Sequence, residues 1–352
     1  MDMRLAGLTA LLLLSASCAD DVQVGRSEAI CMTTKAPSGD DAPCRILVVR
    51  DSDLQRVGAA GYEPYYETWL PSMEEYSGDV LYTHRAYPSN YDNVHVCGFA
   101  PAAEMDDAAA ASSVTLLDLR DAYGTVAVRY GGGYDNAVWK DVLTAGPVVG
   151  SSLRPLGEDD LLEFGHSVIC VSFRALRSRS MKDLEVMNVR VTFPWESTPY
   201  ELSFDRRLGG YYAVGREGNE LSFPLEYDPV THMIPLETDG GQAQNYAEAG
   251  PFYICRDDYG VTMPRLHFAL DANYTKDKTF HDEGEARHYD DIAVEVYDST
   301  TGRRVADIRP GHRYVVTILF DQDSFEIMAV EDGWEDGGGF TLSVDNPISA
   351  GR

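Results

Sequence analysis

The chain is poor in basic side chains. Among its 352 residues, 29 lysines and arginines stand against 57 aspartates and glutamates, which gives a formal net charge of −28. Nucleic-acid binding needs clustered Lys and Arg that neutralise phosphates, so this balance argues against a nucleic-acid partner and against adsorption to anionic lipid. The acidity is typical of a protein kept soluble at a cell surface. The length exceeds one ordinary core, and two domains are expected.

Short catalytic motifs are also missing. The sequence contains no GxSxG, P-loop, GxGxxG or CxxC, so a nucleophile elbow, a phosphate-binding loop and a zinc ribbon are not supported. The acidic stretch HDEGEARHYDD places His281 and His288 seven residues apart, which is more typical of a solvated loop than of a metal site. DQDSFE lacks the glycine and the distal glutamate of an EF-hand loop. We expect no enzymatic activity, no catalytic residue, no cofactor and no metal.

No long stretch shows a helical period with caps, whereas short alternating segments are frequent. Ile169, Val171 and Phe173 fall on one face of one segment, and Val189 and Val191 fall on one face of the next. A period of two is typical of half-buried antiparallel strands. The 21 tyrosines, with many Val and Thr, also favour strands. Many short strands at regular spacing predict an all-β fold of β-sandwiches.

The apolar run Leu5–Leu14 near the N-terminus is about half of the ~20 residues that span a bilayer, so we expect no transmembrane helix there. A basic residue precedes it, and small residues follow it up to Cys18, as in an export signal. An ordinary secretory signal does not need this cysteine. The segment resembles a bacterial lipobox, although Ser15 stands where an apolar residue is usual. The resemblance implies removal of residues 1–17 and acylation of Cys18, with the lipid holding the mature protein on the membrane.

The two acids behind the cysteine, Asp20 and Asp21, resemble the signal that sends some Bacteroidetes lipoproteins to the outer face of the outer membrane. Short acidic pairs are common in any chain. A plain cleaved signal and a core helix are the alternatives for the N-terminal segment.

Six cysteines are present, and five remain if Cys18 is acylated. Cys31 and Cys44 bracket a short polar loop and are candidates for a disulfide. A lone cysteine in an apolar strand is usually a small buried hydrophobe. Three cysteines occupy such positions: Cys97, Cys170 and Cys255.

Several segments, in their order and spacing, resemble the fimbrillin family of Bacteroidales, the subunits of surface pili. KDVLTAG (140–146) resembles the strand that closes the family's first domain. LLEFGHSVICVSFRA (161–175) resembles the strand that opens the second, with His166 in the family's His position. IRPGHRYVVTILFDQDSFEIMAVEDGWEDGGG (308–339) resembles the family's ending, and VHVCGFAPAA (94–103) an upstream strand. The region 19–90 matches poorly.

The resemblance implies two tandem transthyretin-like antiparallel β-sandwiches behind a lipoprotein signal peptide. The organisation that we predict is a signal peptide, a tether or propeptide, two sandwiches divided near Gly157–Leu161, and a donor-strand tail. Their ranges are 1–17, 18–43, 44–160, 161–336 and 337–352.

The resemblance also implies an assembly mechanism. An Arg- or Lys-specific protease removes the N-terminal strand at the cell surface, and a strand from another subunit fills the groove. This donor-strand exchange is β-augmentation, in which main-chain hydrogen bonds give affinity and side-chain pockets give specificity. The candidate cleavage residues are Lys35, Arg45 and Arg50. The alternative is that these are ordinary surface bases on ordinary first strands.

The C-terminal segment has the pattern of a donor strand. Phe340, Leu342 and Val344 alternate with polar residues behind three glycines that can act as a hinge. The alternative is that this segment pairs within its own domain. In the family, stalk subunits tend to carry such an appendage, tip subunits lack it and anchor subunits keep their lipidated N-terminus, so the resemblance favours a polymerising subunit.

The function expected from the sequence is therefore that of a structural subunit of cell-surface fimbriae. Its precursor would be lipid-anchored at the outer membrane, and it would assemble with other subunits and contribute to adhesion to host or bacterial surfaces. The alternatives are a surface glycan-binding lipoprotein and a hydrolase or protease inhibitor on a sandwich scaffold.

Overall fold

A computed structural model describes sixteen stretches of the chain. They are residues 29–35, 44–56, 65–69, 80–100, 113–118, 123–129, 143–157, 159–197, 199–205, 210–215, 220–227, 230–238, 245–254, 262–279, 284–322 and 324–333. Within these stretches, no helix combines the length and the apolar content that crossing a membrane would require. The predicted signal peptide, Cys18 and the predicted tail lie outside them.

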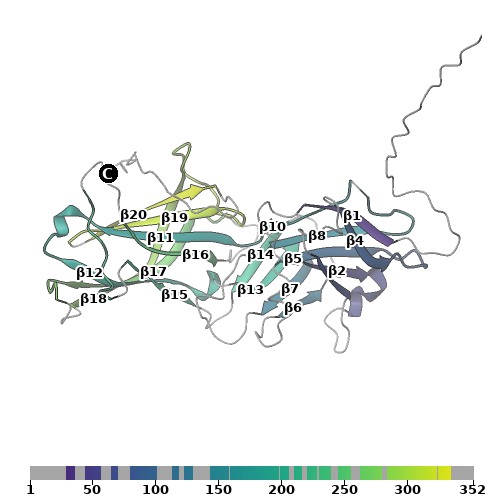
Figure 1. Cartoon of the computed structure of the whole chain (residues 1–352), viewed down its shortest axis with the longest axis horizontal. Coiled ribbons are helices and arrows are strands. Elements are labelled where there is room, and N and C mark those ends of the chain that lie inside the picture. The colour runs from purple at the N-terminus through teal and green to yellow at the C-terminus, as the bar shows by residue number, and fades with distance from the viewer. Residues whose placement is uncertain are drawn as a thin grey trace, which may run out of the picture.

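The N-terminal half forms two sheets (Figure 1). The five-stranded sheet has the order β10-β8-β5-β2-β3, and the three-stranded sheet has the order β4-β1-β9. The helical element η1 is a short 3-10 turn. The bounds are β1 (Ala29–Lys35), β2 (Cys44–Arg50), η1 (Asp51–Arg56), β3 (Tyr65–Trp69), β4 (Val80–Ala86), β5 (Val94–Ala100), β8 (Leu143–Gly150), β9 (Leu161–Glu163) and β10 (Gly165–His166).

One hydrophobic cluster lies between these two sheets. Ile46 and Val96 enter it from the five-stranded sheet, and Ile30 and Leu162 enter it from the three-stranded sheet. All four side chains are fully buried. Burial of each aliphatic side chain contributes roughly 1.5–3 kcal/mol, so both sheets depend on this shared interior.

The C-terminal half is one eight-stranded arrangement with the order β15-β12-β17-β18-β20-β19-β11-β16. Its two end strands meet, because Glu226, just after β15, and Glu248 of β16 exchange backbone hydrogen bonds of 3.3 and 3.1 Å. The order therefore closes on itself at this bridge. The bounds are β11 (Ile169–Arg177), η2 (Arg179–Met181), β12 (Glu185–Phe193), η3 (Trp195–Ser197), β15 (Leu221–Pro224), β16 (Ala247–Ile254), β17 (Arg265–Thr275), β18 (Glu285–Asp298), β19 (Arg313–Phe320) and β20 (Phe325–Asp332).

The first and last strands of this half lie close together. β11 pairs in parallel with β19, and β19 pairs antiparallel with β20. In this register Cys170 lies opposite Arg313, and Arg313 lies opposite Asp332. The start of β11 and the end of β20 are therefore at the same end of the sheet.

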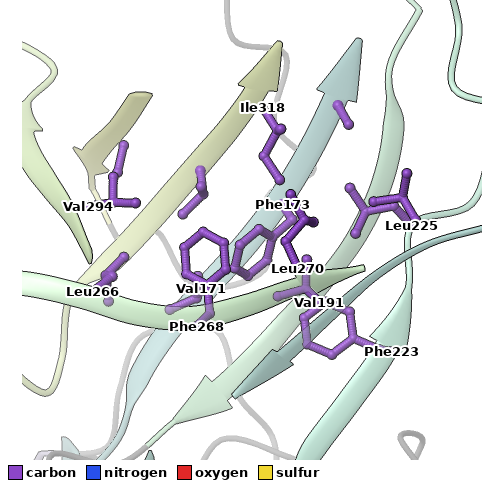
Figure 2. Packing of buried hydrophobic residues seen from close by; sticks show 14 of the residues in the cluster. Val171, Phe173, Val191, Phe223, Leu225, Leu266, Phe268, Leu270, Val294 and Ile318 are labelled. Carbon is purple, nitrogen blue, oxygen red and sulfur yellow. The ribbon is translucent and has the colours of Figure 1, made fainter. Parts of the chain in front are cut away.

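Aromatic rings fill the C-terminal core. The ring of Phe173 lies 5.1 Å from that of Phe268 and 5.7 Å from that of Phe193, both in edge-to-face geometry. Figure 2 shows Phe173 of β11 and Phe268 of β17 packed with Leu270 and Ile318. Such edge-to-face pairs add about 0.5–1.5 kcal/mol to the free energy of burial.

Hairpins from the two halves of the chain share a third sheet with the order β14-β13-β7-β6. β7 comes from the N-terminal half and pairs antiparallel with β13 from the C-terminal half, with Val126 opposite Leu202. Figure 1 shows these strands between the two larger groups. The bounds are β6 (Ser113–Asp118), β7 (Tyr123–Arg129), β13 (Pro199–Asp205) and β14 (Gly210–Gly215).

The predicted all-β fold is confirmed. The helical elements of the described residues are short 3-10 turns, and the sheets pack as sandwiches. The predicted buried face of Ile169, Val171 and Phe173 is also confirmed, because each side chain is at most 1% exposed. Cys97 and Cys170 are buried, as expected for small hydrophobes in strands.

Two segments are placed differently from the predicted division. β9 and β10 lie beyond residue 160, yet they pair with β1 and β8, and Leu162 and Phe164 belong to the N-terminal cluster. Phe164 packs onto the backbone of β5 at Gly98, where an added Cβ would lie 2.3 Å from its ring. The segment 18–43, predicted as a tether or propeptide, contains β1, and a removable strand within a propeptide is consistent with that prediction.

Candidate functional site

The N-terminal strand β1 occupies the middle of the three-stranded sheet. Figure 1 shows it beside β4. It pairs antiparallel with β4, where Thr33 lies opposite Val80. It pairs in parallel with β9, where Thr33 lies opposite Leu161. Because β1 separates β4 from β9, its removal would expose the backbone hydrogen-bonding groups of both neighbours.

Ile30 attaches β1 to the core. Its side chain is 0% exposed and belongs to the cluster that contains Val96, Leu162 and Phe164. Its carbonyl oxygen accepts a 3.1 Å hydrogen bond from the hydroxyl of Thr83 on β4. An apolar pocket and a buried polar contact therefore hold the strand at the same residue.

One chain segment connects β1 to the strand that follows it. The strand ends at Lys35, and the next described element is β2, which begins at Cys44 in the other sheet. One cut between these two strands would leave β1 held by hydrogen bonds and burial alone. The segment that precedes β1 leads back to the predicted lipidation residue, Cys18.

The three candidate cleavage residues have different backbone environments. Lys35 is the last residue of β1 and lies opposite Glu163 of β9. Arg45 and Arg50 lie in β2, which is paired on one side with β3 and on the other with β5. Proteases cut most readily at loops and strand ends. Arg50 also ends its strand, but η1 follows it at once and its guanidinium binds Asp53, so the geometry favours Lys35.

The end of β2 is fixed further by side chains. The Arg50 guanidinium binds the buried Asp53 carboxylate, with N···O distances of 2.6 and 2.8 Å. Asp51 accepts a 2.8 Å hydrogen bond from the Asn93 amide and contacts His95 of β5. These contacts hold the β2 terminus and η1 against β5.

The structure describes only some of the remaining predicted site residues. Cys31 lies in β1 and Cys44 begins β2, and their disulfide stays a prediction. Cys18 and the predicted donor residues Phe340, Leu342 and Val344 lie outside the described residues.

The stretch HDEGEARHYDD, expected as a solvated loop, is largely strand. Its residues from Glu285 onward belong to β18, and His288 is bonded by carboxylates on this strand and on β17. Within the described residues, no group of three or more His, Cys, Asp or Glu side chains is arranged to hold a metal ion.

Comparisons with known proteins give structural matches of low sequence identity. No protein-family model matches the chain, and no curated protein matches it significantly. Solved structures similar to it include proteins of Bacteroides and related bacteria that are described as fimbrial, cell-adhesion or polysaccharide-binding proteins. A "fimbrial protein" from Bacteroides vulgatus is 12% identical with a TM-score of 0.45, over 87% of this chain and 99% of that one.

Two further structures cover a similar extent. A "putative cell adhesion protein" from Bacteroides uniformis is 14% identical with a TM-score of 0.39, over 87% of this chain and 99% of that one. "Putative polysaccharide binding proteins" from Bacteroides thetaiotaomicron give 10% identity and a TM-score of 0.43, over 87% of this chain and 96% of that one.

Proposed function

We propose that the chain is a structural, non-enzymatic subunit of a cell-surface fimbria that polymerises by donor-strand exchange into its N-terminal sandwich. The observation that carries this proposal is the placement of β1 between β4 and β9, with Ile30 fully buried. A strand in the middle of a sheet, joined to the next described strand by one short segment, can be cut from the chain and replaced by an equivalent strand. The family resemblance of the sequence supports the same mechanism.

The N-terminal sandwich is the better acceptor of the two. In the C-terminal core the end strands β15 and β16 meet at the Glu226–Glu248 bridge, so an incoming strand would have to break existing backbone pairs. In the N-terminal sandwich, loss of β1 would leave a prepared groove with hydrogen-bonding groups on both sides and an empty Ile30 pocket. β-Augmentation uses these two elements, backbone pairing for affinity and a pocket for specificity.

The proposed sequence of events begins with a lipid on Cys18, which keeps the precursor at the outer membrane surface. Cleavage after Lys35 then separates β1 from β2. An apolar strand of a neighbouring subunit displaces β1, and the proposed donor is the tail segment that contains Phe340, Leu342 and Val344. The partners are thus other fimbrial subunits, and the assembled fimbria contributes to adhesion.

Trypsin treatment of the purified full chain tests this proposal. We expect a first cut after Lys35, identified by N-terminal sequencing, followed by filaments in negative-stain electron microscopy and by high-mass species in size-exclusion chromatography. Untreated protein should remain monomeric. A nicked protein that stays monomeric at high concentration and retains β1 would contradict donor-strand exchange.

A further inference from the structure

A cavity of about 350 Å³ opens on the outer face of the C-terminal sheet, far along the chain from β1. β12, β17 and β18 form its floor, and the segment before β15 forms one wall. Titratable groups dominate its lining. The residues used in the argument are Thr192, Glu220, His267, His288, Asp290 and Asp291. This histidine–aspartate pocket has no part in the proposed strand exchange.

A β-bulge shapes the pocket. Phe268 of β17 lies opposite Ile292 of β18, but Leu270 lies opposite Tyr289, so two residues of β18 face one residue of β17. These two residues are Asp290 and Asp291, and both are exposed. In a regular strand neighbouring side chains would point to opposite faces, so the bulge turns a second carboxylate outward.

The bulge is held in an unfavourable backbone conformation. Asp291 has a φ of 46°, in the left-handed region that L residues other than glycine adopt rarely. Its carboxylate lies 2.9 Å from Nδ1 of His267 on the neighbouring strand β17. Strained bulges persist where surrounding contacts fix them, and here a histidine from the adjacent strand provides one such contact.

His288 makes the second contact and constrains its own protonation state. Its Nδ1 lies 2.6 Å from an oxygen of Asp271 on β17, and its Nε2 lies 2.6 Å from an oxygen of Asp290 in the bulge. An ionised carboxylate can only accept hydrogen bonds, so both ring nitrogens must donate. Only the imidazolium form satisfies both bonds. A neutral ring must release either the link to β17 or the link to the bulge.

Other charged groups lie on the neighbouring elements and on β18 itself. Glu220 lines the pocket wall before β15. Arg190 on β12 lies opposite Asp271 in the strand register, and its guanidinium donates to the Ser222 hydroxyl of β15. On β18 itself, Arg287 stacks 4.1 Å from the ring centroid of Tyr274 on β17. The groups bonded to the His288 ring itself are two carboxylates, those of Asp271 and Asp290.

We propose that this cluster is a proton-operated latch: the imidazolium form of His288 holds the β18 bulge against β17, beside the His267–Asp291 contact, and loss of the His288 proton loosens the bulge over the pocket. Deprotonation of His288 removes the positive charge that lies between the carboxylates of Asp271 and Asp290, which then repel one another. The link between His288 and Asp290, next to the strained Asp291, weakens at the same time.

The direction of the pH dependence follows from His288. Hydrogen bonding to Asp271 and then to Asp290 raises the pKa of His288 above its ordinary value. A raised folded-state pKa means that the latch is fully closed below the unfolded pKa and is lost as the pH rises through the folded pKa. Mildly acidic surroundings therefore favour the closed bulge, and alkaline surroundings favour the open one.

Hydrogen exchange and histidine titration test the latch in the full chain. Amide protection at residues 289–292 is compared at about pH 5 and about pH 9, after correction for the intrinsic pH dependence of exchange. We expect it to fall about threefold or more, because the free energy of an exposed ion pair corresponds to a change of that size. Protection in β19 should not change. NMR should show that His288 titrates above a histidine of an unfolded peptide.

A matched pair of variants separates the latch from a general effect of pH. In His288→Gln the side chain does not titrate, so protection of 289–292 should be low at both pH values. The control is His312→Gln, because the His312 ring contacts Glu331 and accepts from Arg309, away from the bulge. It should keep the pH dependence of the natural sequence.

The outcomes are distinct. Protection that does not depend on pH in the natural sequence would overturn the proposal, as would a pH dependence that survives in His288→Gln. Both variants change partly exposed side chains, and circular dichroism melts check that each is folded. Strand exchange at β1 is measured separately, so failure of the latch leaves the proposed function intact.

Discussion

The hydroxyl of Thr83 donates a 3.1 Å hydrogen bond to the carbonyl oxygen of Ile30, and both residues are at least 95% buried. This contact links β4 to the strand that we propose is exchanged. It lies next to the apolar pocket that Ile30 fills, so backbone pairing, one hydroxyl and one aliphatic side chain hold β1 together. Each of these contributions can be changed separately.

Thr83→Val removes the hydroxyl and keeps the shape of the side chain. A buried hydrogen bond contributes about 0.5–1.5 kcal/mol, so we expect a loss of that size in the free energy of unfolding. Amide exchange in β1 should speed up, while exchange in β17 should not change. Thr192→Val is the matched control, because the Thr192 hydroxyl binds Ser222 in the other half of the chain. Equal exchange rates in β1 of both variants would contradict a holding role for Thr83.

Ile30→Ala should leave a cavity in the N-terminal core. Substitutions of this kind cost roughly 2–5 kcal/mol, because the transfer free energy of the lost atoms and the cavity both count. Denaturant unfolding, monitored with a probe in each half of the chain, should show the N-terminal transition at a lower denaturant concentration. The C-terminal transition should be unchanged. Ile318→Ala, in the other core, should give the reverse pattern. A shared shift of both transitions in either variant would show that the two cores unfold together.

Lys35→Gln should prevent the activating cut, because it removes the basic side chain at the end of β1. Arg50→Gln should leave the cut unaffected, since Arg50 lies at the end of an internal strand and binds Asp53. Limited trypsin digestion with N-terminal sequencing distinguishes the two. A protein cut at Arg45 or Arg50 while β1 remains uncut would place the processing site in β2 instead.

Charged residues in the tail should block assembly. The triple variant Phe340→Asp, Leu342→Asp, Val344→Asp should fold as a monomer, because a donor strand contributes nothing to its own subunit. After trypsin it should not form filaments, since unpaired charges cannot enter an apolar groove. Thermal melts and size-exclusion chromatography measure both effects. A large drop in the melting temperature of the monomer would instead identify the tail as an internal strand.

The buried ion pair of Arg177 and Glu185 gives a test of the C-terminal core. The two side chains are 2.6 Å apart, and Arg177 also donates to the carbonyl oxygens of Ile234 and Leu184. Burial lowers the pKa of Arg177, and the Glu185 carboxylate opposes that shift. Glu185→Leu should cost about 3–5 kcal/mol, because a buried guanidinium loses its counter-charge, and adding Arg177→Met should recover much of that loss. Urea denaturation of the two variants measures the difference.

Alternation of apolar residues was sufficient to predict the main strands. Ile169, Val171 and Phe173 repeat every second residue, and the structure buries all three in β11. Local spacing identifies the strand, but not its surroundings. β11 is buried on both faces and pairs in parallel with β19, whereas a half-buried antiparallel strand was expected. The central position of β1 in its sheet could not be predicted from such spacing. Its parallel pairing with β9 joins residues more than a hundred positions apart, and no local pattern records such a partner.

Short and irregular elements were the ones that the sequence did not predict. β9 has three residues, too few for a periodic signal, so its place in the N-terminal sandwich depends on the packing of Leu162. The acidic stretch at the start of β18 is a strand although its sequence shows no apolar alternation. The bulge interrupts the period of two, because Asp290 and Asp291 both face outward. The pocket that these residues line with His267 and His288 therefore could not be found from spacing.

The register of the C-terminal core has a mechanical consequence. The chain enters this core at the start of β11 and leaves it at the end of β20, and Cys170, Arg313 and Asp332 lie side by side at that one end. A tensile force applied between these two points would break the backbone hydrogen bonds of the strand pairs one after another, starting from that end. It would not load all of them at once in shear. In a fibre whose joints pull on these two points, the C-terminal core would open at low force and lengthen the fibre before the covalent chain was strained.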